Sequence, residues 1–205
     1  ALASDAAMAI RNAQLFMDLR KESQKNHDLF IRTMVVLGST IEAKDKYTHW
    51  HTQRVTDISV LIARQMNANG STQLSEKFIE DLYVSSMLHD IGKIGVPESV
   101  LNKIETLTAD DYRILQQHPL FGVEILAPLS ELQESLSGVR YHHERYDGKG
   151  YPDKLNGDRI PLIAAIISVA DAFDAITTDR PYRKGRTLAE AVQEIKKNIG
   201  TQFHP

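Results

Sequence analysis

Residues 75–95 read SEKFIEDLYVSSMLHDIGKIG and predict an amphipathic helix that ends in a pair of polar residues. Ser75 can cap this helix, because a serine hydroxyl accepts a hydrogen bond from a free backbone N–H of the first turn. Helical spacing predicts one buried face, made of Phe78, Ile79, Leu82 and Met87. His89 and Asp90 follow directly, so we expect both side chains to be largely buried. A buried carboxylate is costly unless it is paired or binds a cation.

The rest of the chain also predicts helices. Their expected ranges are residues 4–26, 28–43, 51–67, a helix opening at Thr108, a strongly apolar helix from Pro161 to about Thr178, and residues 188–199. Residues 144–160 are rich in glycine and turn dipeptides, which predicts a loop. The sequence has no alternating apolar run of convincing strand length, so the predicted fold class is all-α, without an internal repeat.

Composition excludes several classes of protein. The chain has 205 residues, of which 42% are hydrophobic and 25% charged, and it has no cysteine. Disulfide scaffolds, zinc fingers, iron–sulfur sites with thiolate ligands and cysteine nucleophiles are therefore excluded. A formal net charge of −3 argues against a duplex-DNA binder, which usually has a strong basic excess, so we expect no DNA partner.

The termini and the apolar runs indicate a cytoplasmic fragment. The longest apolar-rich run, residues 162–170, is far shorter than the ~20 residues that span a bilayer, so we expect no membrane insertion. The start lacks both an initiator methionine and a signal peptide, and the end lacks a helix stop or a polar tail. We therefore expect both ends to be cuts in a longer protein.

A set of histidines and carboxylates predicts a metal centre. Each of them alone is more often a hydrogen-bonded core or surface residue than a ligand. Together they give five imidazoles and two carboxylates, from His51, His89, Asp90, His118, His142, His143 and Asp171. Neutral imidazole combined with carboxylate suits iron, manganese, zinc or nickel. Seven ligands exceed the needs of one metal but suit two metals if a carboxylate bridges them.

Basic residues near these candidates indicate a phosphate substrate. Lys93 follows Asp90 by about one helical turn, and Arg180 and Arg183 follow the helix that carries Asp171. The guanidinium fork of arginine matches phosphate oxygens. The alternative is a solvated helix end whose cations complement the helix dipole. Next to two metals, phosphate anchoring is the better interpretation, and it predicts hydrolysis of a phosphoester.

At this point the sequence resembles the HD-GYP family, bacterial phosphodiesterases that degrade cyclic di-GMP and form a branch of the HD metal-dependent phosphohydrolases. The resemblance rests on HDIGKIG at residues 89–95, on HHERYDGKGYP at residues 142–152 and on residues 171–183. It implies an HD-domain helical bundle over residues 28–205, truncated at its C-terminus, that follows an N-terminal linker helix.

The resemblance also implies roles for single residues. His51, His89, Asp90 and Asp171 would bind one divalent metal, and Asp90, His118, His142 and His143 would bind a second, with Asp90 bridging. Fe(II) or Mn(II) is the expected metal, and other transition metals stay open. A hydroxide that bridges the metals would be the nucleophile. Asp90 and Lys93 are the expected catalytic residues, since Lys93 would steady the scissile phosphate and protonate the leaving oxygen. The expected substrate-binding residues are Lys93, Gly150, Tyr151, Pro152, Arg180 and Arg183.

Departures from the family pattern affect the expected product. Trp50 stands where the family often has glycine, next to the ligand His51. Some members hold a third metal through a glutamate one turn before that histidine, where this chain has Tyr47. We therefore expect two metals and linear pGpG as the product, with further cleavage to GMP left open.

Residues 1–27 resemble the terminal helix of a GAF sensor domain that runs into a linker. This implies an upstream sensor, a homodimer through the N-terminal helix, and GGDEF-type or other signalling proteins as partners. Two alternatives stay open. One is a phosphodiesterase for another cyclic dinucleotide, such as cyclic GMP-AMP, or for a mononucleotide. The other is a catalytically weak cyclic di-GMP sensor or protein-interaction module.

Overall fold

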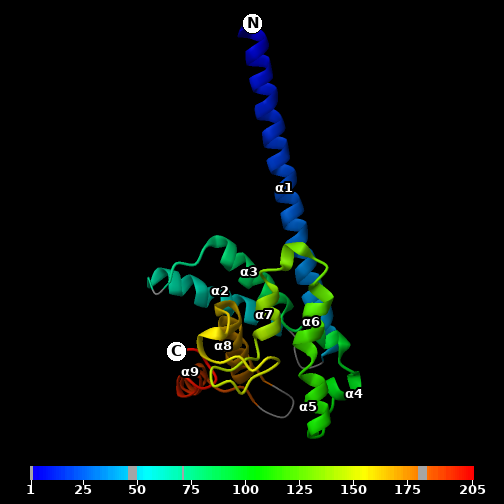
Figure 1. The fold of residues 1–205 in the computed structure, drawn as a ribbon, viewed down its shortest axis with the longest axis vertical. Helices are drawn as coiled ribbons and strands as arrows, with labels where there is room; N and C mark the ends of the chain where they lie inside the picture. The colour runs from blue at the N-terminus through cyan, green and yellow to red at the C-terminus, as the bar shows by residue number, and fades with distance from the viewer. Residues whose placement is uncertain (1, 46–49, 71, 180–183) are drawn as a thin grey trace. The chain divides into compact units, whose positions relative to one another are not determined.

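A computed structural model describes residues 2–45, 50–70, 72–179 and 184–205, and all regular structure in these ranges is helical (Figure 1). The predicted all-α class is therefore confirmed. Every helix in the described ranges is too short or too polar to span a bilayer. The chain forms two compact units, which divide between Val36 and Leu37.

The first unit is helical and exposes most of its apolar side chains. Helix α1 (Leu2–Lys44) is continuous where the sequence predicted helices over residues 4–26 and 28–43. Phe16 is 68% exposed and Leu19 is 70% exposed, and Leu15 and Leu29 are also exposed. An α-helix with so much apolar surface in water gains little from burial, so its stability in the single chain depends mainly on local propensity.

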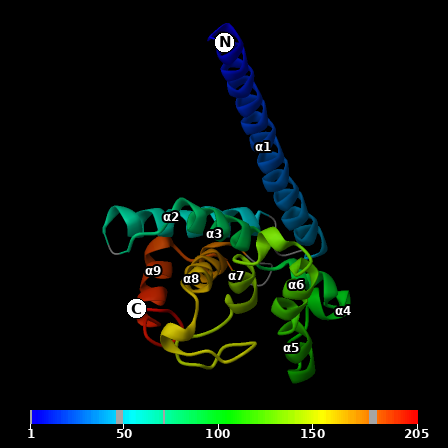
Figure 2. The ribbon, with the colours of Figure 1, turned by 45° about the horizontal axis from the view of Figure 1, so that its top comes forward.

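The core of the second unit is built from three long helices. Helices α2 (His51–Ala68), α3 (Glu76–Leu88) and α8 (Leu162–Thr177) share a hydrophobic cluster, in which Val55, Leu82 and Ile167 are fully buried. In Figure 2, α8 lies between α9 (Leu188–Lys197) and α7 (Leu136–Tyr141), and both of these helices contact it. The apolar character of α8 on most of its faces follows from this position.

The predicted helix caps are confirmed. Ser75 accepts a hydrogen bond from the backbone N–H of Phe78, and Thr108 forms a capping box with Asp111 at the start of α5 (Ala109–Leu115). Leu61, which the sequence placed on the inner face of α2, is 65% exposed, because α3 and α8 cover only part of that helix.

Several short helices connect the long ones. They are η1 (Ile91–Gly95), α4 (Glu98–Leu101), α6 (His118–Leu126), η2 (Ser130–Leu132) and η3 (Gly157–Arg159). Most are too short to show a clear apolar period, and the sequence analysis did not predict them as separate elements. η3 lies inside the predicted loop over residues 144–160.

Candidate metal centre

The seven predicted ligand residues lie at helix ends or face the interior of the bundle. His51 is the first residue of α2, His89 follows α3, His118 is the first residue of α6, and the two adjacent histidines follow α7. Asp171 lies within α8. The side chains of His89, His118 and His142 are each 1% exposed. Residues more than 100 positions apart in the sequence are therefore brought to one buried point.

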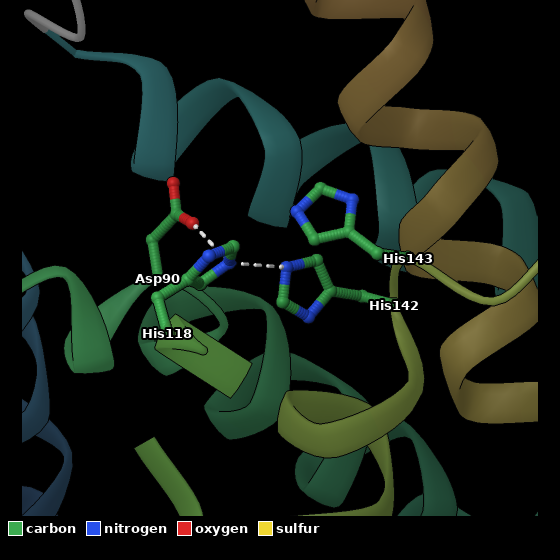
Figure 3. Close-up of side chains that lie close together, drawn as sticks. All are labelled: Asp90, His118, His142 and His143. Atoms are coloured by element: carbon green, nitrogen blue, oxygen red, sulfur yellow. Dashed lines mark hydrogen bonds and ion pairs between the residues drawn. The ribbon is translucent and has the colours of Figure 1, made fainter. Parts of the chain in front are cut away.

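The ligand atoms form two groups that share one carboxylate. Asp90, His118, His142 and His143 each offer an atom within 4.8 Å of all the others, and their side chains point toward one another in Figure 3. His51, His89 and Asp90 form a second group with the same spacing. Asp171 adjoins this second group, since its Oδ1 atom lies 3.3 Å from Nε2 of His51.

Hydrogen bonds to the backbone orient three of the imidazoles. The Nδ1 atoms of His89, His118 and His142 each lie within hydrogen-bond distance of a backbone carbonyl three residues earlier. The acceptors are Ser86, Leu115 and Val139, at 2.7, 2.8 and 2.8 Å. Because a carbonyl only accepts, each Nδ1 carries the hydrogen in the neutral ring. In the neutral ring, each Nε2 therefore has a lone pair that faces the centre.

These lone pairs fit a bound metal. The Nε2 atoms of His118 and His142 lie 3.3 Å apart, and neither has a hydrogen to share in the neutral form. Burial lowers the pKa of His118 to about 4 and holds that of His142 well below its usual value, so both rings are neutral. Burial alone would lower the pKa of His89, but Asp90, whose Oδ2 atom lies 3.4 Å from the buried Nε2 atom, raises it to about 9, so a metal ion would replace a proton at this nitrogen. Such a set of converging acceptors suits a transition-metal cation.

A permanent cation lies beside the shared carboxylate. Burial alone would raise the pKa of Asp90, but Lys93 and the neighbouring imidazoles hold it well below its usual value. The Nζ atom of Lys93 lies 2.7 Å from Asp90 Oδ2 and 2.9 Å from Asp45 Oδ2. Burial alone would lower the pKa of Lys93, but these two carboxylates raise it above its usual value. Lys93 is therefore a charged ammonium group at the edge of the site.

Hydrogen bonds from Lys44 and close packing at Gly92 fix the backbone of η1. The ammonium of Lys44 donates to the carbonyls of Lys93, Ile94 and Val96, at 3.2, 2.7 and 2.6 Å. Gly92 lies against the start of α6, where a Cβ atom would come within 2.9 Å of the carbonyl carbon of His118. The absence of a side chain at Gly92 therefore allows Asp90 and His118 to meet.

Sequence reasoning missed the residues that orient His51. Asp174 is 3% exposed, and its Oδ2 atom lies 2.7 Å from Nδ1 of His51. Arg54 donates to both oxygens of this carboxylate, with a distance of 3.0 Å from its NH2 nitrogen to Oδ2. Burial alone would raise the pKa of Asp174, but His51 and Arg54 lower it to about 2. The available signal was spacing: Arg54 follows His51 by three residues, and Asp174 follows Asp171 by three.

The predicted substrate-binding triplet lies against the predicted metal ligands. The ring of Tyr151 packs on the ring of His143, with 4.8 Å between their centroids. Gly150 is buried, and a Cβ atom there would come within 2.6 Å of the carbonyl oxygen of His143. Pro152 follows through a cis peptide bond. A side chain at Gly150 would therefore push the loop away from the centre.

Glu144 fixes the loop that carries Gly150, Tyr151 and Pro152 through hydrogen bonds to its backbone. Its carboxylate is 2% exposed and accepts hydrogen bonds from the backbone N–H groups of Asp153 and Leu155, at 2.7 and 3.0 Å. Glu144 belongs to the HHERYDGKGYP block, but no role was predicted for it from the sequence. Its position predicts that it shapes the loop and does not bind metal.

Predicted metal ligands line two cavities. The α9 cavity, of about 600 Å³, is lined by residues of α8, α9 and the loop after α7. The α5 cavity, of about 560 Å³, is lined by η1, α4, α5 and the segment between them. His143, Tyr151 and Asp171 line both. Arg180 and Arg183, the predicted phosphate anchors, lie outside the described residues.

The match to a known family accounts for this arrangement. A family model described as an HD domain matches residues 36–205. The chain belongs to the HD domain family. The resemblance to the HD-GYP family that the sequence motifs indicated is thereby confirmed, since curated cyclic di-GMP phosphodiesterases are among the relatives of this HD domain.

Three relatives illustrate the likeness of the HD domain. A cyclic di-GMP phosphodiesterase of Thermotoga maritima is 37% identical over 182 residues, which are 87% of this chain and 47% of that protein. The cyclic di-GMP phosphodiesterase response regulator RpfG of Xanthomonas campestris is 37% identical, over 84% of this chain and 45% of its own length. The 3′3′-cGAMP-specific phosphodiesterase 3 of Vibrio cholerae is 35% identical, over 87% and 38%. The chain spans less than half the length of each.

Solved structures share the fold of the HD domain. A cyclic GMP-AMP-specific phosphodiesterase of Vibrio cholerae, V-cGAP3, superposes with a TM-score of 0.65 at 22% identity, over 85% of this chain and 46% of that one. Bd1817, an HDG"Y"P protein of Bdellovibrio bacteriovorus, gives a TM-score of 0.59 at 22% identity, over 76% and 47%. Both support the helical arrangement described above.

Proposed function

We propose that this HD domain is a metal-dependent phosphodiesterase that opens cyclic di-GMP to linear pGpG. The observation that carries the proposal is Asp90, whose carboxylate belongs to two groups of converging imidazoles in a buried site. A carboxylate shared in this way suits two divalent ions held close together, an arrangement that recurs in enzymes that hydrolyse phosphoesters.

The proposed ions are two Fe(II) or Mn(II) per chain, with other transition metals as alternatives. His51, His89, Asp90 and Asp171 would hold one, and Asp90, His118, His142 and His143 would hold the other. When bound, such ions lower the pKa of water toward neutrality and stabilise negative charge on a phosphate.

The residues of the chain position the diester and compensate its charge. Lys93 would place a fixed positive charge beside the scissile phosphate, where it stabilises the charge that grows in the transition state. We favour this electrostatic role over proton donation, because two carboxylates hold the pKa of Lys93 above its usual value. Arg180 and Arg183 are proposed to anchor the phosphates.

The reaction is a hydrolysis. The oxygen of a water molecule forms a bond to phosphorus and loses a proton, and the bond from phosphorus to the 3′ oxygen of the sugar breaks. The 3′ oxygen gains a proton, which leaves a 3′ hydroxyl on one nucleoside and a 5′ phosphate on the other. One such cleavage converts the ring into pGpG, and a second would yield GMP.

Two cavities support the proposed substrate class. A cyclic dinucleotide has a base on each side of its phosphates, and the proposed metal ligands His143 and Asp171 line both the α9 and the α5 cavity. Tyr151 lines both and offers an aromatic face to a base, while Gly150 and Pro152 hold it in place. A relative named as a 3′3′-cGAMP-specific phosphodiesterase makes cyclic GMP-AMP the second candidate substrate. A domain that binds cyclic di-GMP but turns it over slowly is the non-enzymatic alternative.

The wider context is also part of the proposal. Residues 1–27 would be a linker from a GAF-like sensor, and residues 28–205 the phosphodiesterase domain of a cytoplasmic signalling protein. The exposed apolar side chains of the first unit, Leu15, Leu19 and Leu29 among them, support a homodimer formed through α1. GGDEF-type proteins would be signalling partners.

The test is a product analysis. The chain is purified without oxygen, loaded with Mn(II) or Fe(II), and mixed with cyclic di-GMP, and the products are separated by chromatography. The proposal predicts pGpG as the first product, and chelation of the metal should stop its formation. Tight binding of cyclic di-GMP without any product would favour the sensor alternative.

A further inference from the structure

The α9 cavity is lined by small side chains of α8 and by an aromatic ring. Ser168, Ala172 and Ala175 line it from one face of α8, at spacings of four and three residues. Phe203, which is 4% exposed, forms an apolar part of its wall. A lining of small side chains and an aromatic ring suits a planar heterocycle. The metal ligands Asp171 and His143 line the same cavity.

Glu194 of α9 also lines the α9 cavity. The Oε1 atom of Glu194 accepts a hydrogen bond from Nδ2 of Asn198 at 3.2 Å. Its Oε2 atom forms an ion pair with Arg186 at 3.3 Å. Each carboxylate oxygen accepts about two hydrogen bonds, so both oxygens keep an acceptor position beyond these contacts. Glu194 can therefore receive two donors side by side.

A guanidinium lines the same cavity. Arg145 uses Nε and NH2 on the two oxygens of Asp147, at 3.1 and 2.9 Å. The fork has five N–H donors, so three donors are not used in this pair. Arg145 and Glu194 thus bring donors and acceptors to the same cavity.

This pairing of charges matches guanine and opposes adenine. Guanine presents two adjacent donors, N1–H and N2–H, which a carboxylate accepts, and two acceptors, O6 and N7, which arginine recognises. Adenine presents a lone pair at N1, which a carboxylate repels, and an amino donor at the position of O6. We propose that Glu194 and Arg145 make the α9 cavity a guanine-selective subsite, so that a substrate must carry at least one guanine. This rests on the proposed function, because it assumes that the ligand is a cyclic dinucleotide.

The test compares three substrates: cyclic di-GMP, 3′3′-cyclic GMP-AMP and cyclic di-AMP. The metal-loaded native chain should hydrolyse the first two, with a kcat/KM for cyclic di-AMP that is about 100-fold lower than for cyclic di-GMP. Glu194→Gln should lower kcat/KM for cyclic di-GMP by about 10- to 100-fold, because one donor of guanine then meets an amide N–H. The preference for cyclic di-GMP over cyclic di-AMP should shrink by a similar factor.

Two variants control for a structural effect. Arg186→Gln removes the ion pair of Glu194 but keeps its carboxylate, and Glu124→Gln changes an exposed acid on α6 that lines neither cavity. Both should keep the native preference between the two symmetric dinucleotides. The inference is overturned if Glu194→Gln leaves that preference unchanged, if Arg186→Gln reproduces its loss, or if the native chain cleaves cyclic di-AMP as well as cyclic di-GMP.

Equilibrium binding by calorimetry separates this inference from the proposed function. If no dinucleotide is hydrolysed, but cyclic di-GMP binds more tightly than cyclic di-AMP and Glu194→Gln removes the difference, the guanine subsite stands and the phosphodiesterase proposal fails. If hydrolysis occurs and the preference does not depend on Glu194, the phosphodiesterase proposal stands and the subsite fails. If no dinucleotide binds, both are overturned.

Discussion

Replacing Asp174 by asparagine should weaken one of the two proposed metal sites and spare the other. Asp174 is 3% exposed and contacts Nδ1 of His51 at 2.7 Å, whereas no described contact links it to His118 or His142. Asparagine keeps the size of the side chain and one acceptor, but it removes the negative charge that increases the basicity of the imidazole.

The expected magnitude follows from the change of a charged acceptor into a neutral one. A hydrogen bond to a charged group contributes about 1.5–3 kcal/mol net and a neutral one about 0.5–1.5 kcal/mol, so the loss of the charge costs about 1–1.5 kcal/mol. Changes to a residue that orients a metal-binding histidine lower metal affinity by about 10- to 100-fold, which corresponds to about 1.4–2.8 kcal/mol. The two estimates meet at about a 10-fold effect, so the dissociation constant of the His51 site should rise by about that factor.

The assay is a titration of the metal-free chain with Mn(II), in which free Mn(II) is followed by electron paramagnetic resonance. The native chain should show two binding steps, and Asp174→Asn should shift only one. Asp57→Asn is the matched control, since Asp57 is an exposed acid on α2 that accepts a hydrogen bond from Gln53. It should change neither step by more than about 2-fold. Equal weakening of both steps, or no shift in either, would refute the orienting role of Asp174.

Three further perturbations have defined outcomes. Asp90→Asn should remove most hydrolysis and lower the metal content below two per chain, by elemental analysis, and unchanged metal and turnover would contradict a shared carboxylate. Gly92→Ala should destabilise the fold by about 3 kcal/mol in urea unfolding, since its Cβ would collide with the backbone of His118, and a loss below about 0.5 kcal/mol would show that η1 can move. Lys103 and the cap of α5 lower the pKa of Asp111 to about 2, so its contribution to stability is present above pH 4 and is lost as the pH falls toward 2. The stability difference between the native chain and Asp111→Asn should therefore shrink over that interval in pH-dependent thermal unfolding, and a constant difference would be inconsistent with that pKa.

The long elements could be predicted from the sequence because their signals are local. The helix that leads to His89 and Asp90 has a cap and an apolar period within one segment, and the structure reproduces both. The apolar helix that carries Asp171 was predicted from its composition and its proline start, and it extends over Leu162–Thr177. Local signals of this kind do not depend on how distant segments pack.

The residues missed by sequence analysis act across large sequence separations. Asp174 contacts His51 from 123 positions away, and Asp45 contacts Lys93 from 48 positions away. Each is an ordinary aspartate in its own segment, and only packing reveals the partner. The prediction that Leu61 is buried was wrong for a related reason. Periodicity defines a face of a helix but does not say how much of that face a neighbouring helix covers.

The most direct test of the central claim is a joint titration of metal and activity. The metal-free chain receives increasing Mn(II) at a fixed saturating concentration of cyclic di-GMP, and bound metal and pGpG are measured in the same samples. We predict two ions per chain and a rate of pGpG formation that rises steeply when the second ion binds. Formation of pGpG without bound metal, or two bound ions per chain without pGpG, would contradict it.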